Sequence, residues 1–135
     1  MRLVIIAVGR LRSPYADDVA HYSKLLGRYA RLEQIELRDG ERVGARIGER
    51  DFVSLLASDG AVYDSLAFAA FIEERRASGR DLAFVIGGAH GLELERADHH
   101  LSLGALTLPH QLARVVLLEQ IYRAHKIIAG EPYHY

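Results

Sequence analysis

Two apolar runs in the second half of the chain each stop at residues that favour turns. The run 82–86 stops at the loop 87–91, which contains three glycines, and the run 101–108 stops at Pro109 and His110. Glycine has no Cβ atom, so backbone N–H and C=O groups of this loop can approach a ligand closely. Ligands of open α/β sheets bind beyond the carboxyl ends of the strands. The two strand ends are therefore candidates for one ligand site, although the glycine loop is equally typical of a tight strand-to-helix turn.

A third strand end is expected at Leu56, shortly before the turn sequence Ser58-Asp59-Gly60. Residues 103–108 combine bulky apolar side chains with Gly104 and Ala105. This mixture is typical of an apolar pocket that reads polar groups through its backbone, and it is equally typical of a plain core strand. The glycine loop has neither G-x-G-x-x-G spacing nor a following Lys-Ser/Thr pair, which disfavours a phosphate cradle.

The segment 111–128 is predicted to be a helix, and a short tail follows it. Apolar residues cover more than half of the circumference of this helix, which exceeds what one sheet face needs and indicates a subunit interface. Glu119 and Arg123 are four residues apart, in the order that favours a surface salt bridge. We expect the tail, with Tyr133 and His134, to take part in the function.

The elements that must position these residues alternate between strands and helices. Residues 3–8 form an apolar run rich in Val and Ile, which is typical of a strand covered on both faces. Ser13-Pro14 and Asp64-Ser65 are both typical of helix starts, and Gly79 is predicted to end the second helix. Short alternating elements favour a parallel or mostly parallel α/β sheet. The remaining expectations are a half-exposed strand at 35–38, a loop or one short helix at 39–51, and a strand at 52–57.

The composition indicates one globular domain over residues 1–135. Half of the residues are apolar, 26% are charged, and no apolar run approaches the roughly 20 residues of a membrane span. The sequence has no cysteine, which excludes disulfides and thiolate metal sites, and the pair His99-His100 lacks metal-ligand spacing, so we predict no metal. We expect a cytoplasmic protein, since the run 3–8 is too short for the hydrophobic part of a signal peptide.

The net charge of -1 argues against a uniformly basic nucleic-acid-binding protein, but the charge is uneven along the chain. Lys and Arg number six against three Asp and Glu in residues 1–35, eight against thirteen in 36–104, and three against two in 105–135. The two ends are thus basic and the middle is acidic. This pattern indicates a local face that binds anions.

Four ordered motifs, together with a short one near the start, carry a family resemblance. They are Phe84-Val85-Ile86-Gly87-Gly88-x-x-Gly91, Leu101-Ser102-Leu103-x-x-Leu106-Thr107-Leu108-Pro109-His110, Glu119-Gln120-Ile121-Tyr122-Arg123-Ala124 and Pro132-Tyr133-His134, preceded by Ala7-Val8-Gly9-Arg10-Leu11. In this order and spacing, the sequence closely resembles the RlmH family of SPOUT methyltransferases. The match is strong over residues 82–135, fair over 1–38 and poor between them.

The resemblance implies an α/β fold of the SPOUT α/β-knot type, with a mostly parallel sheet flanked by helices and a C-terminal trefoil knot. It also implies a homodimer that transfers a methyl group from S-adenosylmethionine to N3 of a pseudouridine in 23S large-subunit ribosomal RNA. We expect the substrate to be the assembled ribosome. The implied catalytic residues are Arg123, Tyr133 and His134. The implied cofactor contacts are Leu56, Gly87, Leu103, Gly104, Ala105, Leu106, Thr107 and Leu108.

Within this interpretation His134 is the leading candidate to contact the base or accept its proton, since histidine titrates near neutral pH. A frayed terminal histidine is the alternative. Arg123 and Arg114 would hold phosphate or the negative charge that develops on the base. The sequence departs from the family at 39–51, where family members carry a longer helical segment. Two other functions stay open: a non-catalytic dimeric protein of this fold that associates with RNA or the ribosome, and an α/β enzyme that binds a nucleotide or phosphate.

Overall fold

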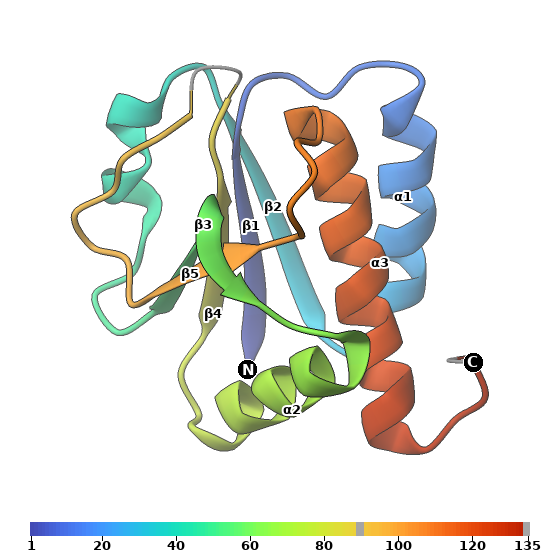
Figure 1. Cartoon of the computed structure of the whole chain (residues 1–135). Coiled ribbons are helices and arrows are strands. Elements are labelled where there is room, and N and C mark those ends of the chain that lie inside the picture. Colours follow the sequence, from blue (N-terminus) through green and yellow to red (C-terminus); the bar gives the residue numbers. More distant parts are fainter. Residues whose placement is uncertain (89–90, 134–135) are drawn as a thin grey trace.

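The chain folds around one five-stranded sheet in which all strands are parallel (Figure 1). The computed structural model describes residues 1–88 and 91–133. The strand order is β2-β1-β4-β3-β5, which confirms the mostly parallel α/β sheet expected from the sequence. In chain order the strands are β1 (Arg2–Val8), β2 (Arg31–Leu37), β3 (Phe52–Val62), β4 (Leu82–Ile86) and β5 (His99–Ser102).

Three α-helices cover one face of the sheet (Figure 1). They are α1 (Tyr15–Leu26), α2 (Ser65–Ala77) and α3 (His110–Ala129). α3 packs against both α1 and α2 as well as against the sheet. Buried side chains such as Leu3 of β1, Phe84 of β4 and Leu117 of α3 form the core on this face. Much of the apolar surface of α3 is thus covered by its neighbouring helices within the chain.

Loops and two short 3-10 helices cover the opposite face of the sheet. The two helices are η1 (Gly40–Arg42) and η2 (Gly44–Arg46). Val43 between them is fully buried against the sheet, and Leu92 from the loop after β4 packs against the same cluster. The segment 39–51 therefore forms two short helices where a loop or one helix was expected. Coverage on both faces accounts for the continuous apolar runs of β1 and β4.

β3 is longer than the sequence predicts. β3 extends to Val62, past the predicted strand end, but its ladder is interrupted across the predicted turn Ser58-Asp59-Gly60. β3 pairs with β4 as far as Leu55 and with β5 from Ser54 to Leu56, and it resumes pairing with β5 at Ala61, so that Leu56 and Ala61 both face Leu101. Residues 57–60 therefore form a bulge that bends the strand. Leu56 is therefore the point at which β3 leaves β4, although the strand itself does not end there.

β5 is shorter than the apolar run that contains it. The sequence predicts a strand over 101–108, but β5 ends at Ser102 and residues 103–108 form a loop. Gly104 has a φ of 131°, a conformation that favours glycine. Its N–H donates to the Ser102 hydroxyl at 3.2 Å, and that hydroxyl donates back to the Gly104 carbonyl at 3.1 Å. These contacts turn the chain out of the sheet, so the alternative of a plain core strand is excluded.

The helix starts agree with the sequence in one case and differ in the other. Asp64 caps α2 as predicted, since its carboxylate accepts a hydrogen bond from the N–H of Ala67 at 2.7 Å. α1 begins at Tyr15, next to the predicted start at Ser13-Pro14, but its N-cap residue is Pro14, whereas the sequence pattern predicts Ser13 as the cap and Pro14 as the first helical residue. The trefoil knot implied by the resemblance stays a prediction.

Candidate functional site

The three strand ends expected from the sequence surround one cavity of about 210 Å³, which we call the strand-end cavity. β4 ends at Ile86, β3 leaves β4 after Leu55, and β5 ends at Ser102, so these carboxyl ends open at the same edge of the sheet. Ala105 is exposed and does not line the cavity. The other seven expected cofactor contacts all line it: Leu56, Gly87, Leu103, Gly104, Leu106, Thr107 and Leu108.

Gly87 allows the loop after β4 to fold back closely on itself. A Cβ atom at this position would meet the Cβ of Leu92 at 2.9 Å and the carbonyl carbon of Gly91 at 3.1 Å. Such contacts are too short for ordinary packing, so any side chain here would push the two ends of the loop apart. The glycine is therefore required by the shape of the cavity wall itself.

Five residues of the loop 103–108 line the strand-end cavity, and part of this loop has unpaired backbone N–H groups. Within the part of the chain that the structure describes, the backbone N–H groups of residues 105–108 donate to no other residue. Leu106 on the same loop is 84% exposed although its side chain is large and apolar. An apolar hollow with unpaired backbone groups suits a flat heteroaromatic ring whose edge carries donors and acceptors, such as adenine.

Arg123, Glu119 and Tyr133 form a second group of site residues, which we call the α3 cluster. Arg123 donates from Nε and Nη2 to Oε1 of Glu119 at 2.9 and 2.7 Å, so the predicted salt bridge is confirmed. The Tyr133 hydroxyl donates to the same oxygen at 3.3 Å, and its ring centre lies 4.7 Å from the Arg123 guanidinium carbon. One oxygen of Glu119 thus accepts hydrogen bonds from both other side chains, and the Arg123 guanidinium also contacts the Tyr133 ring.

The electrostatics of the α3 cluster fix the protonation of two side chains. The hydrogen bond to Glu119 raises the pKa of Arg123, which keeps the guanidinium charged. Burial, followed by the charge of Glu119, raises the pKa of Tyr133 to about 12. Tyr133 is therefore a neutral phenol and a hydrogen-bond donor at physiological pH.

The turn after α3 directs the tail back toward this cluster. Gly130 has a φ of 69°, and the N–H of Glu131 donates to the carbonyl of Lys126 at 3.0 Å, as in a Schellman cap. The Glu131 carboxylate also accepts from Lys126 Nζ at 2.9 Å and from the Tyr29 hydroxyl at 3.0 Å. The tail is thus held against α3 as far as Tyr133, and His134 lies outside the described residues.

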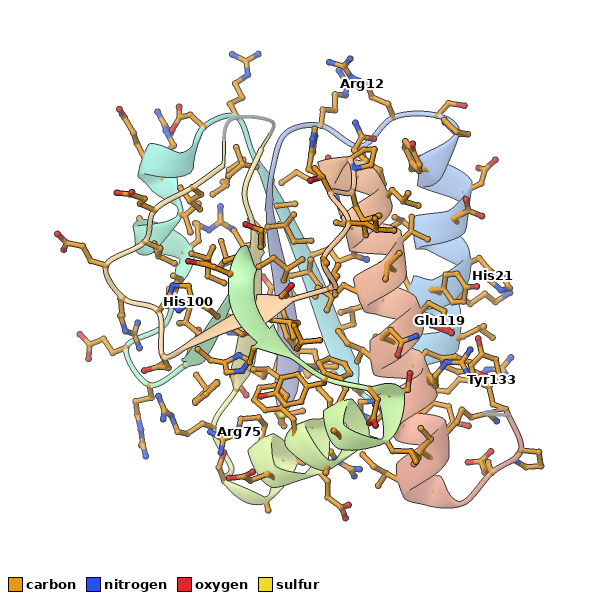
Figure 2. The ribbon with its side chains drawn as sticks, in the orientation of Figure 1. Arg12, His21, Arg75, His100, Glu119 and Tyr133 are labelled. Atoms are coloured by element: carbon orange, nitrogen blue, oxygen red, sulfur yellow. The ribbon has the colours of Figure 1, made fainter. Side chains whose placement is uncertain are left out.

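The strand-end cavity and the α3 cluster lie toward opposite ends of α3. His110, the first residue of α3, lines the cavity, whereas Arg123 lies in the second half of the helix. At 1.5 Å of rise per residue, their separation along the helix is about 20 Å. Figure 2 shows Glu119 and Tyr133 beside the lower half of α1, away from the loops at the strand ends. Within one chain, the structure does not bring Arg123 and Tyr133 to the cavity.

Arg114 occupies an interior position between α3 and β2. Its side chain donates to Gln34 at 2.7 Å and forms an ion pair with Glu36 at 3.3 Å. It is only 5% exposed, so the predicted contact with phosphate is wrong. The sequence pattern did not indicate that Arg114 is buried, because Arg114 belongs to the polar stripe of the helix. The polar side chains that contact it come from an edge strand distant in the sequence.

A family model described as "Predicted SPOUT methyltransferase" matches residues 1–134 of this chain. The chain belongs to the SPOUT methyltransferase family. Three relatives that cover 99% of both chains have the name "Ribosomal RNA large subunit methyltransferase H". The relatives from Streptococcus agalactiae serotype III and from Anaeromyxobacter strain Fw109-5 are each 43% identical to this chain, and the relative from Carboxydothermus hydrogenoformans is 44% identical to it. The alignments extend over 152 to 158 residues against 135 in this SPOUT protein, so the relatives contain residues that it lacks.

Several residues of these sites were not singled out by sequence reasoning. Ser58, Leu92 and Ala113 line the strand-end cavity, yet only the fold of this SPOUT protein brings them together. Glu119 is predicted merely as a salt-bridge partner, but it also accepts a hydrogen bond from the tail. No spacing rule covers that contact, because it depends on the turn at Gly130.

Within residues 1–88 and 91–133, no group of three or more His, Asp or Glu side chains is placed to hold a metal ion. Over the same residues, no helix combines the length and the apolar character that crossing a membrane requires.

Proposed function

We propose that this SPOUT protein is an S-adenosylmethionine-dependent methyltransferase that acts on N3 of a pseudouridine in 23S ribosomal RNA, within the assembled ribosome. The observation that carries the proposal is the strand-end cavity, since seven of the eight residues that the resemblance assigns to the cofactor line it. The names of the relatives support large-subunit ribosomal RNA as the methyl acceptor. The net charge of -1 supports a shaped ribosomal surface, rather than naked RNA, as the substrate.

The side chains and backbone of the strand-end cavity suit the adenosyl group of this cofactor. Leu103, Leu106 and Leu108 supply apolar contacts, and the unpaired N–H groups of residues 106–108 can recognise the edge of adenine. When bound, the cofactor supplies an activated methyl group on a positively charged sulfur. The contribution of the chain itself is to position the acceptor and exclude water.

Methylation at N3 requires that the nitrogen lose its proton as it attacks the methyl carbon. His134 is our candidate for the proton acceptor, because imidazole titrates near neutral pH. Tyr133 does not act as the base in this proposal, since its pKa is raised to about 12. Its hydroxyl stays bonded to Glu119, and Arg123 stabilises the negative charge that develops on the base.

We further propose that the SPOUT protein works as a homodimer in which one subunit completes the site of the other. Support comes from the position of Arg123 on α3, about 20 Å along the helix axis from His110 and about 15 Å from Ala113, the two residues of α3 that line the cavity of the same chain. Exposed apolar side chains also adjoin the cavity, namely Leu106 at 84% exposure and Val62 at 71%. Val62 lines a neighbouring cavity that shares residues 101–103 with the strand-end cavity. A partner seated on this surface would cover apolar area and bring its own α3 cluster to the cavity.

Ligand-dependent thermal unfolding, followed by a methylation assay on ribosomes, tests the proposed function. We expect S-adenosylmethionine to raise the Tm and a phosphorylated nucleotide to leave it unchanged, because only a ligand of the folded state stabilises it. Labelled methyl groups should then appear on one pseudouridine when ribosomal RNA is mapped. A shift with the nucleotide alone would favour a nucleotide-binding enzyme, and no shift with either ligand would favour a non-catalytic protein of this fold.

A further inference from the structure

A cavity lined by three arginines adjoins the strand-end cavity. It has a volume of about 480 Å³, and we call it the basic cavity. Arg10, Arg12 and Arg38 line it, and Asp39 lines it as well, so its side chains carry more positive than negative charge in a chain whose net charge is -1. Three residues line both cavities: Gly88, Gly91 and His110.

The backbone that carries these arginines is fixed from two sides. Arg10 and Arg12 follow β1 and Arg38 follows β2, and the carboxyl ends of these two parallel strands are adjacent. The N–H of Gly9 donates to the carbonyl of Leu37 in β2 at 2.8 Å. The N–H of Arg12 donates to the side chain of Gln111 in α3 at 2.7 Å. An anion that binds here therefore needs to order side chains only, which lowers the entropic cost of binding.

The guanidinium groups of Arg10, Arg12 and Arg38 have no ion-pair or hydrogen-bond partner among the described residues. All three residues are exposed, and Figure 2 shows Arg12 at the edge of the sheet opposite Tyr133. By contrast, Arg2 and Arg114 are each paired with a carboxylate. Unpaired guanidinium groups gathered around one hollow suit phosphate, which they can bind through two parallel hydrogen bonds.

We propose that the basic cavity binds phosphodiester groups of the RNA strand whose base enters the strand-end cavity, an inference that rests on the proposed function. The acceptor base must leave its stack to reach the cofactor, and contacts to the adjoining backbone offset the cost of that step. Because the two cavities share part of their walls, phosphates next to the acceptor nucleotide lie within reach of the arginines. The cofactor carries no phosphate, and in this proposal the arginines contact the RNA rather than the cofactor.

The test compares two triple variants that remove the same charge from opposite edges of the sheet. The first is Arg10→Ala with Arg12→Ala and Arg38→Ala. The control is Arg28→Ala with Arg31→Ala and Arg50→Ala, which lie at the edge where β2 and β3 begin. Binding to large ribosomal subunits is measured over a series of salt concentrations, and KM for the subunits is measured by methyl transfer. Calorimetry gives the affinity for S-adenosylmethionine.

We expect the first variant to raise Kd and KM for ribosomal subunits about tenfold or more, and to reduce the slope of log Kd against log salt by about 2, at about 0.7 per phosphate of a single strand. For the control variant, Kd and KM for ribosomal subunits should stay within about twofold of the wild-type values. All variants should bind S-adenosylmethionine with wild-type affinity. Replacing the three arginines by lysine keeps the charge and should keep the salt slope, which separates loss of charge from loss of structure.

A wild-type salt slope in the first variant, or an equal loss in the control, would overturn the inference about the basic cavity. Failure of the proposed function has a different signature. In that case the wild-type protein transfers no methyl group to ribosomes, whatever the salt dependence of its binding.

Discussion

At the scale of single residues, Glu119 decides the geometry of the α3 cluster. One of its carboxylate oxygens accepts hydrogen bonds from both Arg123 and Tyr133. The contact with Arg123 follows from helical spacing, whereas the contact with Tyr133 depends on the left-handed turn at Gly130. The carboxylate thus holds a guanidinium group and a neutral phenol side by side.

The protonation of Tyr133 can be measured directly and changed through Glu119. We expect the pKa of Tyr133 to be about 12, and we expect Glu119→Gln to lower it. Because burial is the largest cause of the shift, the pKa in the variant should stay above the ordinary value of 10.0. NMR titration of labelled tyrosine rings, with the Tyr133 signal assigned by its loss in Tyr133→Phe, checks both values.

The same shift makes stability depend on pH with a definite sign. The folded pKa of Tyr133 is raised, so its contribution is fully present below pH 10.0 and is lost as the pH rises through about 12. Relative to Tyr133→Phe, the wild-type protein should lose free energy of unfolding over this window. A Tyr133 signal that titrates at 10.0, or a pKa unchanged by Glu119→Gln, would show that the hydroxyl does not contact the carboxylate in solution.

At the scale of elements, the interruption of the ladder between β3 and β5 shapes the strand-end cavity, which residues 56–58 line. β3 stops pairing with β4 after Leu55 and resumes pairing with β5 at Ala61. Gly60 allows the two backbones to come close, since a Cβ atom there would lie 2.6 Å from the carbonyl carbon of His100. β5 then ends at Ser102, and the following loop forms one wall of the cavity. The position of β5 therefore controls the shape of the site.

Gly60→Ala tests this dependence. The added methyl group would clash with the carbonyl of His100 and with the backbone of Leu101 at 2.8 Å, so β5 must move. We expect the free energy of unfolding to fall by about 1–3 kcal/mol, as for other overpacked sites, and the affinity for S-adenosylmethionine to fall with it. Urea unfolding and calorimetry measure the two effects. Gly44→Ala is the control, because a Cβ atom at Gly44 meets nothing within 4 Å. Equal stability of the two variants would refute the tight approach of β5.

The sequence predicted the elements of the sheet better than their ends. β1 and β4 are buried on both faces, and such strands are visible as continuous apolar runs. Ser58-Asp59-Gly60 has the composition of a turn, and the ladder is interrupted there, but the strand resumes beside β5 at Ala61. Residues 103–108 have the composition of a strand, but no neighbouring strand is left to pair with them. In both cases a partner distant in the sequence decided the outcome, and local composition holds no information about it.

At the scale of the whole molecule, the uneven charge and the divided site point to one arrangement. The arginines of the basic cavity and the lining of the strand-end cavity lie at the carboxyl ends of the strands, whereas the α3 cluster lies toward the other end of α3. A symmetric dimer presents each patch twice and can place the α3 cluster of one subunit beside the cavity of its partner. Each complete site would then take its cofactor from one chain and its catalytic side chains from the other.

Subunit mixing tests whether the site is shared between chains. One variant carries Arg123→Ala with Tyr133→Phe, and the other carries Thr107→Arg, which places a positive charge in the strand-end cavity, the site proposed for the positively charged cofactor. Each variant alone should be inactive. After subunit exchange, half of the dimers are mixed and each contains one intact site, so we expect about a quarter of wild-type methyl transfer. A control mixture, in which the Thr107→Arg chain also carries both cluster changes, contains no intact site and should stay inactive. If the first mixture is inactive as well, although the chains exchange, each site belongs to a single chain and the shared arrangement is wrong.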